Sequence, residues 1–187
     1  MSQIGIFFGT DTGTTRLIAK KMAKQLPEGI ASKPLNVNRI DAADLLNYDA
    51  LILGTPSYGE GQVPGISTGV KQGSWEEFLP QLAGLDFTGK RIALYGLGNQ
   101  DKYGSRFASG LFQLYEAFKS AGAEIVGSWP TDGYEFEYSR AVVDGEFVGL
   151  VLDQNNQAMQ TEERMKTWLD QVVPLLLGEN QAAAAVG

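Results

Sequence analysis

Short apolar runs alternate along the chain with longer segments in which apolar residues recur every three or four positions. Short runs rich in β-branched residues are typical of buried strands, and helical periodicity between them predicts a parallel sheet with helices on both faces. The predicted strands are Ile4 to Phe8, Leu35 to Ile40, Ala50 to Gly54, Arg91 to Gly96 and Glu124 to Trp129.

The segments between the runs carry helical patterns. Ile18, Met22 and Leu26 lie at fourfold spacing among basic residues, which predicts a surface helix directly after a threonine-rich loop. Asp41 and Ser74 each precede a helical pattern and are followed three positions later by an acidic residue, a typical helix start. Further helices are expected over Leu111 to Phe118 and from Thr161 to about Leu177.

One segment, Pro130 to Gly149, does not fit the alternation. It contains Asp-Gly pairs at Asp132 and Asp144, which favour hairpin turns, and the alternating stretch YEFEY. We therefore predict a small antiparallel insertion that interrupts the last strand, which resumes over Leu150 to Asp153. The end of the chain, residues 178–187, lacks an apolar face, so we expect it to be disordered and residues 1–177 to form a single domain.

Composition narrows the function classes. The chain has 187 residues, 43% of them apolar, which suffices for one sizeable core. It has no cysteine and no histidine, so disulfides, thiolate metal sites and hydrolytic triads are not expected. A net charge of −7 argues against a nucleic-acid or membrane partner. Without a basic leader or a long apolar run, we expect a cytoplasmic protein.

Three loops follow the first, third and fourth predicted strands and should meet at the carboxyl edge of the sheet, where open α/β folds bind ligands. The first, GTDTGTT, offers backbone amides, hydroxyls and a helix N-terminus to an anion, but lacks the GK[ST] ending of a nucleotide triphosphatase. The other two carry Tyr58 and Tyr103 among glycines, which favours a planar ring held between two aromatic side chains.

The motifs TDTGTT, TPSYGEG and GNQDKYG, in this order and spacing, closely resemble the three flavin-binding loops of flavodoxins, small FMN-binding electron carriers. The resemblance runs from Ile4 to about Leu177. It implies a flavodoxin-like three-layer α/β/α sandwich with a five-stranded parallel sheet of order 2-1-3-4-5. The interrupted last strand resembles the long-chain class, and the loop Val63 to Trp75 resembles that of long-chain flavodoxins from nitrogen-fixing bacteria.

The resemblance also implies roles for particular residues. Thr10 to Thr15 would wrap the FMN phosphate, Tyr103 would stack on the outer face of the ring and Tyr58 would occupy the inner face. Backbone groups near Asn99 would contact the pyrimidine edge of the flavin, and Asn155 would contact the ribityl chain. The residues assigned to FMN are Thr10, Asp11, Thr12, Gly13, Thr14, Thr15, Thr55, Pro56, Ser57, Tyr58, Gly59, Glu60, Leu97, Gly98, Asn99, Gln100, Tyr103, Arg106, Phe107, Ala108 and Asn155. No catalytic residue and no metal ligand is implied.

By the same resemblance the protein would be a low-potential one-electron carrier that cycles mainly between semiquinone and hydroquinone, with the Gly59–Glu60 peptide turning over on reduction. Two residues depart from the family pattern. Asn99 stands where long-chain members usually carry aspartate, and Arg106 where they commonly carry asparagine. We therefore expect a hydroquinone couple less negative than is typical of the class, unless Arg106 points into solvent.

The expected partners are redox proteins with basic docking faces, and we expect this protein to be a monomer. The resemblance suggests nitrogenase reductase as acceptor, and an NADPH-flavodoxin reductase or a pyruvate-flavodoxin oxidoreductase as donor. An FMN-dependent quinone reductase or nitroreductase on the same fold is the alternative, although Tyr103 would cover the ring. A response-regulator module would need a phospho-acceptor aspartate where the third strand ends, and the sequence there reads GTP.

Overall fold

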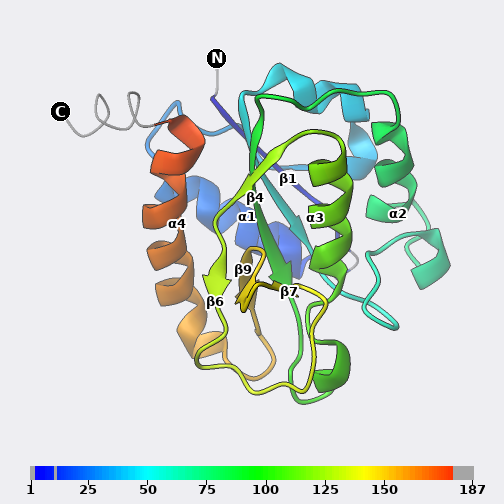
Figure 1. Cartoon of the computed structure of the whole chain (residues 1–187), viewed down its shortest axis with the longest axis vertical. Coiled ribbons are helices and arrows are strands. Elements are labelled where there is room, and N and C mark those ends of the chain that lie inside the picture. The colour runs from blue at the N-terminus through cyan, green and yellow to red at the C-terminus, as the bar shows by residue number, and fades with distance from the viewer. Residues whose placement is uncertain (1–2, 11, 179–187) are drawn as a thin grey trace.

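The computed structural model describes residues 3–10 and 12–178, and its centre is a parallel sheet (Figure 1). The strands lie in the order β2-β1-β3-β4, and both β5 and β9 pair with β4 beyond it. Their bounds are β1 (Ile4–Phe8), β2 (Leu35–Asn36), β3 (Ala50–Thr55), β4 (Arg91–Leu97), β5 (Glu124–Val126) and β9 (Leu150–Leu152). The predicted strand order and the interruption of the last strand are confirmed.

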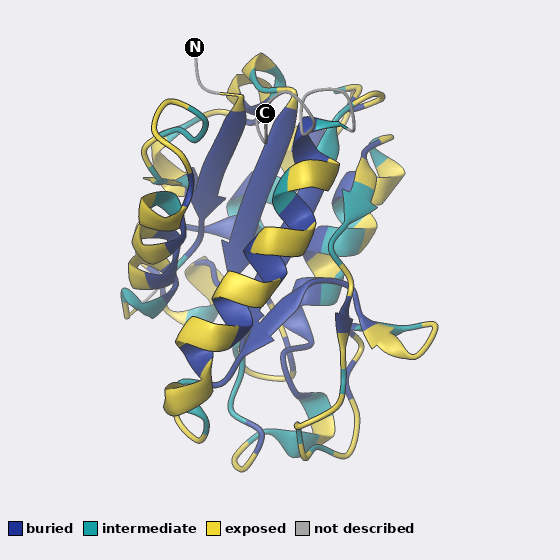
Figure 2. Cartoon of the chain, turned by 90° about the vertical axis from the view of Figure 1, so that its left-hand side faces the viewer, coloured by how far each residue is buried: buried dark blue, intermediate teal, exposed yellow. Residues whose placement is uncertain are grey.

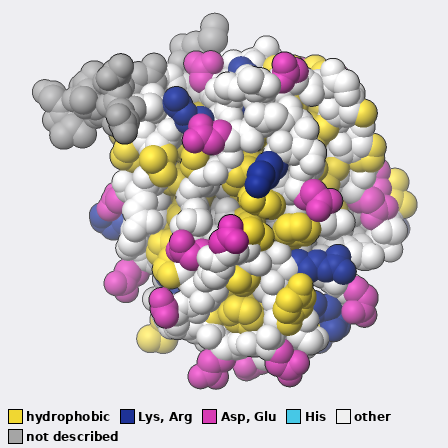
Figure 3. Space-filling view, viewed as in Figure 1, with side chains coloured by type: hydrophobic (Ala, Val, Ile, Leu, Met, Phe, Trp, Pro, Cys, Tyr) yellow, Lys and Arg dark blue, Asp and Glu magenta, His cyan; other side chains and the backbone are white. Residues whose placement is uncertain are grey.

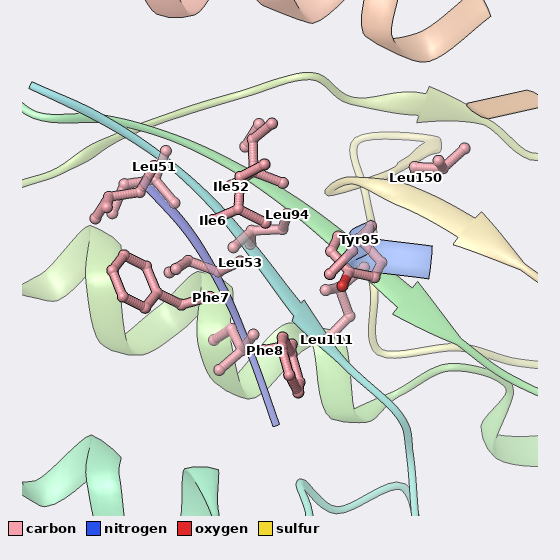
Figure 4. Close-up of a cluster of buried hydrophobic side chains, with 14 of the residues drawn as sticks. Ile6, Phe7, Phe8, Leu51, Ile52, Leu53, Leu94, Tyr95, Leu111 and Leu150 are labelled. Carbon is pink, nitrogen blue, oxygen red and sulfur yellow. The ribbon is translucent and has the colours of Figure 1, made fainter. Parts of the chain in front are cut away.

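The two central strands are buried along their whole length. All residues of β1 and β3 are buried, and their side chains pack on both sides of the sheet (Figure 4). A strand covered on both faces needs apolar residues at every position, which is why these segments read as continuous apolar runs rather than alternating ones.

Helices cover both faces of the sheet and complete a three-layer sandwich, with their outer sides exposed (Figure 2). One layer contains α1 and α4, which contact each other, and α2 and α3 lie on the opposite side (Figure 1). The helices are α1 (Thr14–Gln25), α2 (Trp75–Phe78), α3 (Gly110–Ser120) and α4 (Thr161–Leu177). The 3-10 helices are η1 (Val37–Arg39), η2 (Ala42–Asn47), η3 (Ile66–Thr68), η4 (Leu79–Leu82), η5 (Gly104–Arg106) and η6 (Ala158–Gln160).

The second strand is shorter than predicted. It ends at Asn36, whose side-chain oxygen accepts a hydrogen bond from the backbone amide of Asn38 at 3.1 Å. This local bond caps η1 and replaces the ladder that would have extended the strand to Ile40. The apolar pattern over this segment was therefore a poor guide to its backbone conformation.

The insertion is a small antiparallel sheet of β6 (Trp129–Pro130), β8 (Glu146–Phe147) and β7 (Val142–Val143). A turn with positive φ at Asp144 and Gly145 joins β7 to β8, as the Asp-Gly pair predicted. The stretch YEFEY is not a strand, and the rings of Tyr134 and Phe136 pack in a cluster around Phe107 and Phe147 instead, while Tyr138 is exposed. Trp129, predicted in the main sheet, belongs to this small one.

The predicted disorder of residues 179–187 lies outside the described residues. Within the described ranges, none of the helices combines the length and the apolar character needed to cross a membrane.

Candidate functional site

The loops after β1, β3, β4 and β9 meet at the carboxyl edge of the sheet and enclose a cleft of about 390 Å³. A narrower slot of about 120 Å³ shares five lining residues with the cleft, so the two form one continuous depression. The shared residues are Ser57, Tyr58, Gly98, Asn99 and Tyr103. The loops that sequence patterns associated with a ligand are thus brought together by the parallel topology.

The wide end of the cleft is a threonine cradle at the start of α1. Thr10 Oγ1 accepts a hydrogen bond from the amide of Gly13 at 2.9 Å, and Gly13 takes a φ of 94°, which turns the chain into the helix. The hydroxyl of Thr15 is buried and has no hydrogen-bond partner among the described residues. Because a buried hydroxyl is costly to leave unpaired, Thr15 together with the first helical amides fits an anion.

Tyr95 holds this cradle from below, a role that the sequence did not suggest. Its side chain is fully buried, and its hydroxyl donates a hydrogen bond to the carbonyl of Thr15 at 2.9 Å. The ring crosses β3 at Gly54, where an added Cβ would lie 1.9 Å from the ring. Gly54 therefore lets a strand residue reach under the neighbouring strand to the ligand loop.

The narrow slot is bordered by the two tyrosines. Tyr58 begins a tight turn, since the amide of Gly61 donates to its carbonyl at 2.9 Å. Tyr103 follows β4, and its amide donates to the carbonyl of Asn99 at 2.9 Å. Both tyrosines line the slot together with Gly98. This arrangement suits a flat aromatic ligand.

A buried carboxylate, Asp153, fixes the loops on the far side of the slot. It accepts hydrogen bonds from the amides of Gln100, Asn155 and Asn156 at 2.9, 3.1 and 3.0 Å. Burial alone would raise the pKa of Asp153, but the bonds from Gln100 and Asn156 outweigh it and hold that pKa below its usual value. The charge ties the loop after β4 to the loop after β9.

Most residues assigned by resemblance line this depression. Those that line it are Thr12, Thr14, Thr15, Pro56, Ser57, Tyr58, Gly59, Leu97, Gly98, Asn99, Tyr103, Arg106, Ala108 and Asn155. Those that do not line it are Thr10, Gly13, Thr55, Glu60, Gln100 and Phe107. Asp11 lies outside the described residues.

The residues away from the depression have other partners. Gln100 uses both its backbone amide and its side-chain amide on Asp153, and Phe107 is buried in the aromatic cluster of the insertion. Three lining residues were not assigned from the sequence, namely Gly61, Lys102 and Gln154. Each of the three adjoins an assigned residue in the sequence, which was the available signal.

The chemistry of the lining points to binding rather than to acid–base catalysis. It offers hydroxyls, backbone amides and aromatic faces, and the chain has no histidine or cysteine. In the described part of the chain, no group of three or more acidic side chains is placed to hold a metal ion. The depression therefore suits a phosphorylated ligand with a planar ring.

Comparison with known proteins agrees with this geometry. The flavodoxin family model matches residues 6–168. A flavodoxin from Klebsiella pneumoniae is 49% identical over 172 residues, covering 92% of this chain and 97% of the relative, and one from Enterobacter agglomerans is 47% identical over 178 residues, covering 95% and 100%.

Among solved structures, a Fusobacterium nucleatum flavodoxin bound to flavin mononucleotide superposes with a TM-score of 0.84 at 34% identity, covering 94% of this chain and 99% of that chain. The match of sequence and of fold extends over nearly the whole chain. The protein belongs to the flavodoxin family.

Proposed function

We propose that the chain binds one FMN non-covalently and carries single electrons at low potential between redox proteins. The observation that carries the proposal is the joining of the threonine cradle to a slot between Tyr58 and Tyr103. Flavodoxins are electron-transfer proteins rather than enzymes, and the Fusobacterium relative was solved with flavin mononucleotide. Residues 1–177 are proposed as a single FMN-binding domain.

Each part of the cofactor has a matching set of residues. The phosphate fits the cradle, where the buried hydroxyl of Thr15 lacks a partner among the described residues. The ring fits the slot between Tyr58 and Tyr103, and the linking chain fits the cleft beside Gln154 and Asn155. FMN supplies the redox chemistry, while these residues bind it, orient it and limit its contact with water.

The acidity of the chain supports the low potential. The net charge is −7, and acidic side chains are spread across the face shown in Figure 3 rather than gathered in one patch. Since reduction adds negative charge to the flavin, such surroundings disfavour full reduction. We propose that the protein cycles mainly between semiquinone and hydroquinone.

The proposal extends to partners and location. Exposed acidic residues in the loops after β3 and β4, Glu60 and Asp101, favour brief, salt-sensitive docking on basic faces of redox proteins. We propose nitrogenase reductase as acceptor, an NADPH-flavodoxin reductase or a pyruvate-flavodoxin oxidoreductase as donor, and a cytoplasmic monomer as the working form. The partners are tested by assaying electron transfer with each purified protein. Size-exclusion chromatography of the pure protein tests the monomer, and cell fractionation tests the location.

The first experiment is to saturate the purified protein with FMN and reduce it stepwise without oxygen while recording visible spectra. A long-lived blue neutral semiquinone is the expected result. No uptake of FMN would refute the cofactor assignment. Direct two-electron bleaching, with turnover of benzoquinone by NADPH, would instead indicate a quinone reductase.

A further inference from the structure

Arg106, at the end of η5, reaches across the slot to the loop that carries Tyr58. Its Nε donates a hydrogen bond to the carbonyl of Gly59 at 2.8 Å, and its guanidinium carbon lies 5.1 Å from the centroid of the Tyr103 ring. Its Nη1 is also 3.8 Å from a carboxylate oxygen of Glu60. One side chain thus contacts both walls of the slot.

The wall that contains Tyr58 is anchored at its two ends by α3. Ser57 Oγ accepts from the amide of Gly110 at 3.0 Å, and the amide of Val63 donates to Gln113 Oε1 at 2.7 Å. Between these anchors the chain rises into an exposed turn at residues 59–60. The tip of this wall therefore projects beyond the bonds that fix its base.

The carbonyl of Gly59, at the centre of this turn, accepts its hydrogen bond from outside the turn. The bond from the amide of Gly61 to the carbonyl of Tyr58 makes Gly59 and Glu60 the central residues of a β-turn. Gly59 has a φ of 53°, and Glu60 is not among the positive-φ residues, as in a type II′ turn. The carbonyl between them takes no part in that bond, and it accepts from Arg106.

The hydrogen bond and the ring contact carry more weight than the ion pair. Glu60 has 85% of its side-chain surface exposed, and an exposed pair at 3.8 Å contributes little. A guanidinium can stack flat on a ring and donate in its own plane at the same time, whereas a lysine ammonium has no planar face to stack. The tie therefore depends on the shape of arginine more than on its charge.

We propose that Arg106 is a positioning residue that ties the Gly59 tip to Tyr103 and so keeps the slot closed on a flavin ring. The inference rests on the proposed function, because it concerns the same slot. Loosening the tie lets one wall move away from the ring, which speeds release of the ring more than it slows entry. The phosphate cradle lies at the other end of the cleft and is unaffected.

The test compares wild type with Arg106→Lys, which keeps the charge, and Arg106→Gln, which keeps an amide donor. Arg39→Gln removes the same charge from η1, away from the depression, and serves as control. Flavin fluorescence gives the dissociation constants for FMN and for riboflavin, which lacks the phosphate. Stopped-flow mixing gives the release rates, and urea unfolding of each apoprotein checks folding.

Arg106→Lys should weaken both flavins by the same factor, roughly tenfold, chiefly through faster release, with the unfolding midpoint of the apoprotein unchanged. Arg106→Gln should lose less flavin affinity than Arg106→Lys, and the Arg39→Gln control should bind both flavins as the wild type does. Binding that follows charge alone, normal in the lysine variant and weak in the glutamine variant, would overturn the inference. So would unchanged binding in both variants. Failure of the wild type to bind either flavin would overturn the proposed function as well.

Discussion

Replacing Asp153 by asparagine removes the charge at the centre of the loops behind the slot while keeping the size of the side chain. Oδ2 accepts from the backbone amide and the side-chain amide of Gln100 and from Asn156 Nδ2, at 2.9, 2.8 and 2.9 Å. Oδ1 accepts from the amides of Asn155 and Asn156. Every one of these partners is a donor, so a new NH₂ group faces a donor in either orientation.

The expected loss of stability is calculated for the more favourable orientation of the asparagine amide. If the asparagine oxygen faces the amides of Asn155 and Asn156, the side-chain donors can turn to water but the buried amide of Gln100 cannot. An orphaned buried amide costs about 2 kcal/mol, and two bonds that lose their charge weaken by about 1 kcal/mol each. We expect Asp153→Asn to lower the free energy of unfolding by about 4 kcal/mol at pH 7.

Urea unfolding of wild type and variant measures this loss, with the exposed Asp132→Asn as control. The pKa of Asp153 is lowered in the folded state, so its stabilisation is present above the unfolded pKa, near 4, and is lost as pH falls through the folded pKa. The difference in the free energy of unfolding between wild type and variant should therefore decrease from pH 5 to pH 3. A gap below about 1 kcal/mol at pH 7, or one that widens in acid, would refute the reasoning.

Three further substitutions test other parts of the depression. Thr15→Val removes the unpartnered hydroxyl, so it should weaken FMN roughly tenfold and leave riboflavin binding unchanged; equal loss for both would show that the hydroxyl does not serve the phosphate. Tyr95→Phe removes one donor to the Thr15 carbonyl, which stays in the first turn of α1, and should cost about 0.5–1.5 kcal/mol in urea unfolding, whereas a negligible change would contradict that bond. Asn99→Asp adds a charge at the slot and should lower the semiquinone/hydroquinone potential, by roughly 70 mV at about 10 Å before screening; a raised or unmoved potential in a spectroscopic titration counts against it.

Elements defined by repeated apolar positions were predictable from the sequence. β1 and β3 are buried at every position, and α4 buries a periodic stripe that includes Trp168 and Leu169, so each is specified many times over. Elements specified by few residues were not. β2 ends where Asn36 accepts a local hydrogen bond from the amide of Asn38, and apolar periodicity does not report such a bond.

The supports of the site were hidden for a different reason. Tyr95 and Asp153 read in the sequence as a strand residue and a strand end, because nothing local distinguishes them. Their roles come from partners far along the chain, 80 residues away for the bond from Tyr95 to Thr15 and 53 residues away for the bond from Gln100 to Asp153. Loop motifs in the sequence predict which residues face a ligand. The residues that hold those loops can be identified only from the three-dimensional arrangement of the strands.

Arg106 contributes both a tie across the slot and a positive charge beside it. The charge of Arg106 can be read from the sequence but the direction of its side chain cannot, and the expected shift of the hydroquinone couple depended on that direction. Its bond to the Gly59 carbonyl and its contact with Tyr103 hold the guanidinium at the slot, although 32% of the side-chain surface is exposed. A cation held there favours an anionic ring, and neutral Asn99 adds no opposing charge. The same side chain is therefore expected to close the slot and to make the final reduction easier, two effects that Arg106→Lys separates because it keeps the charge and loses the tie.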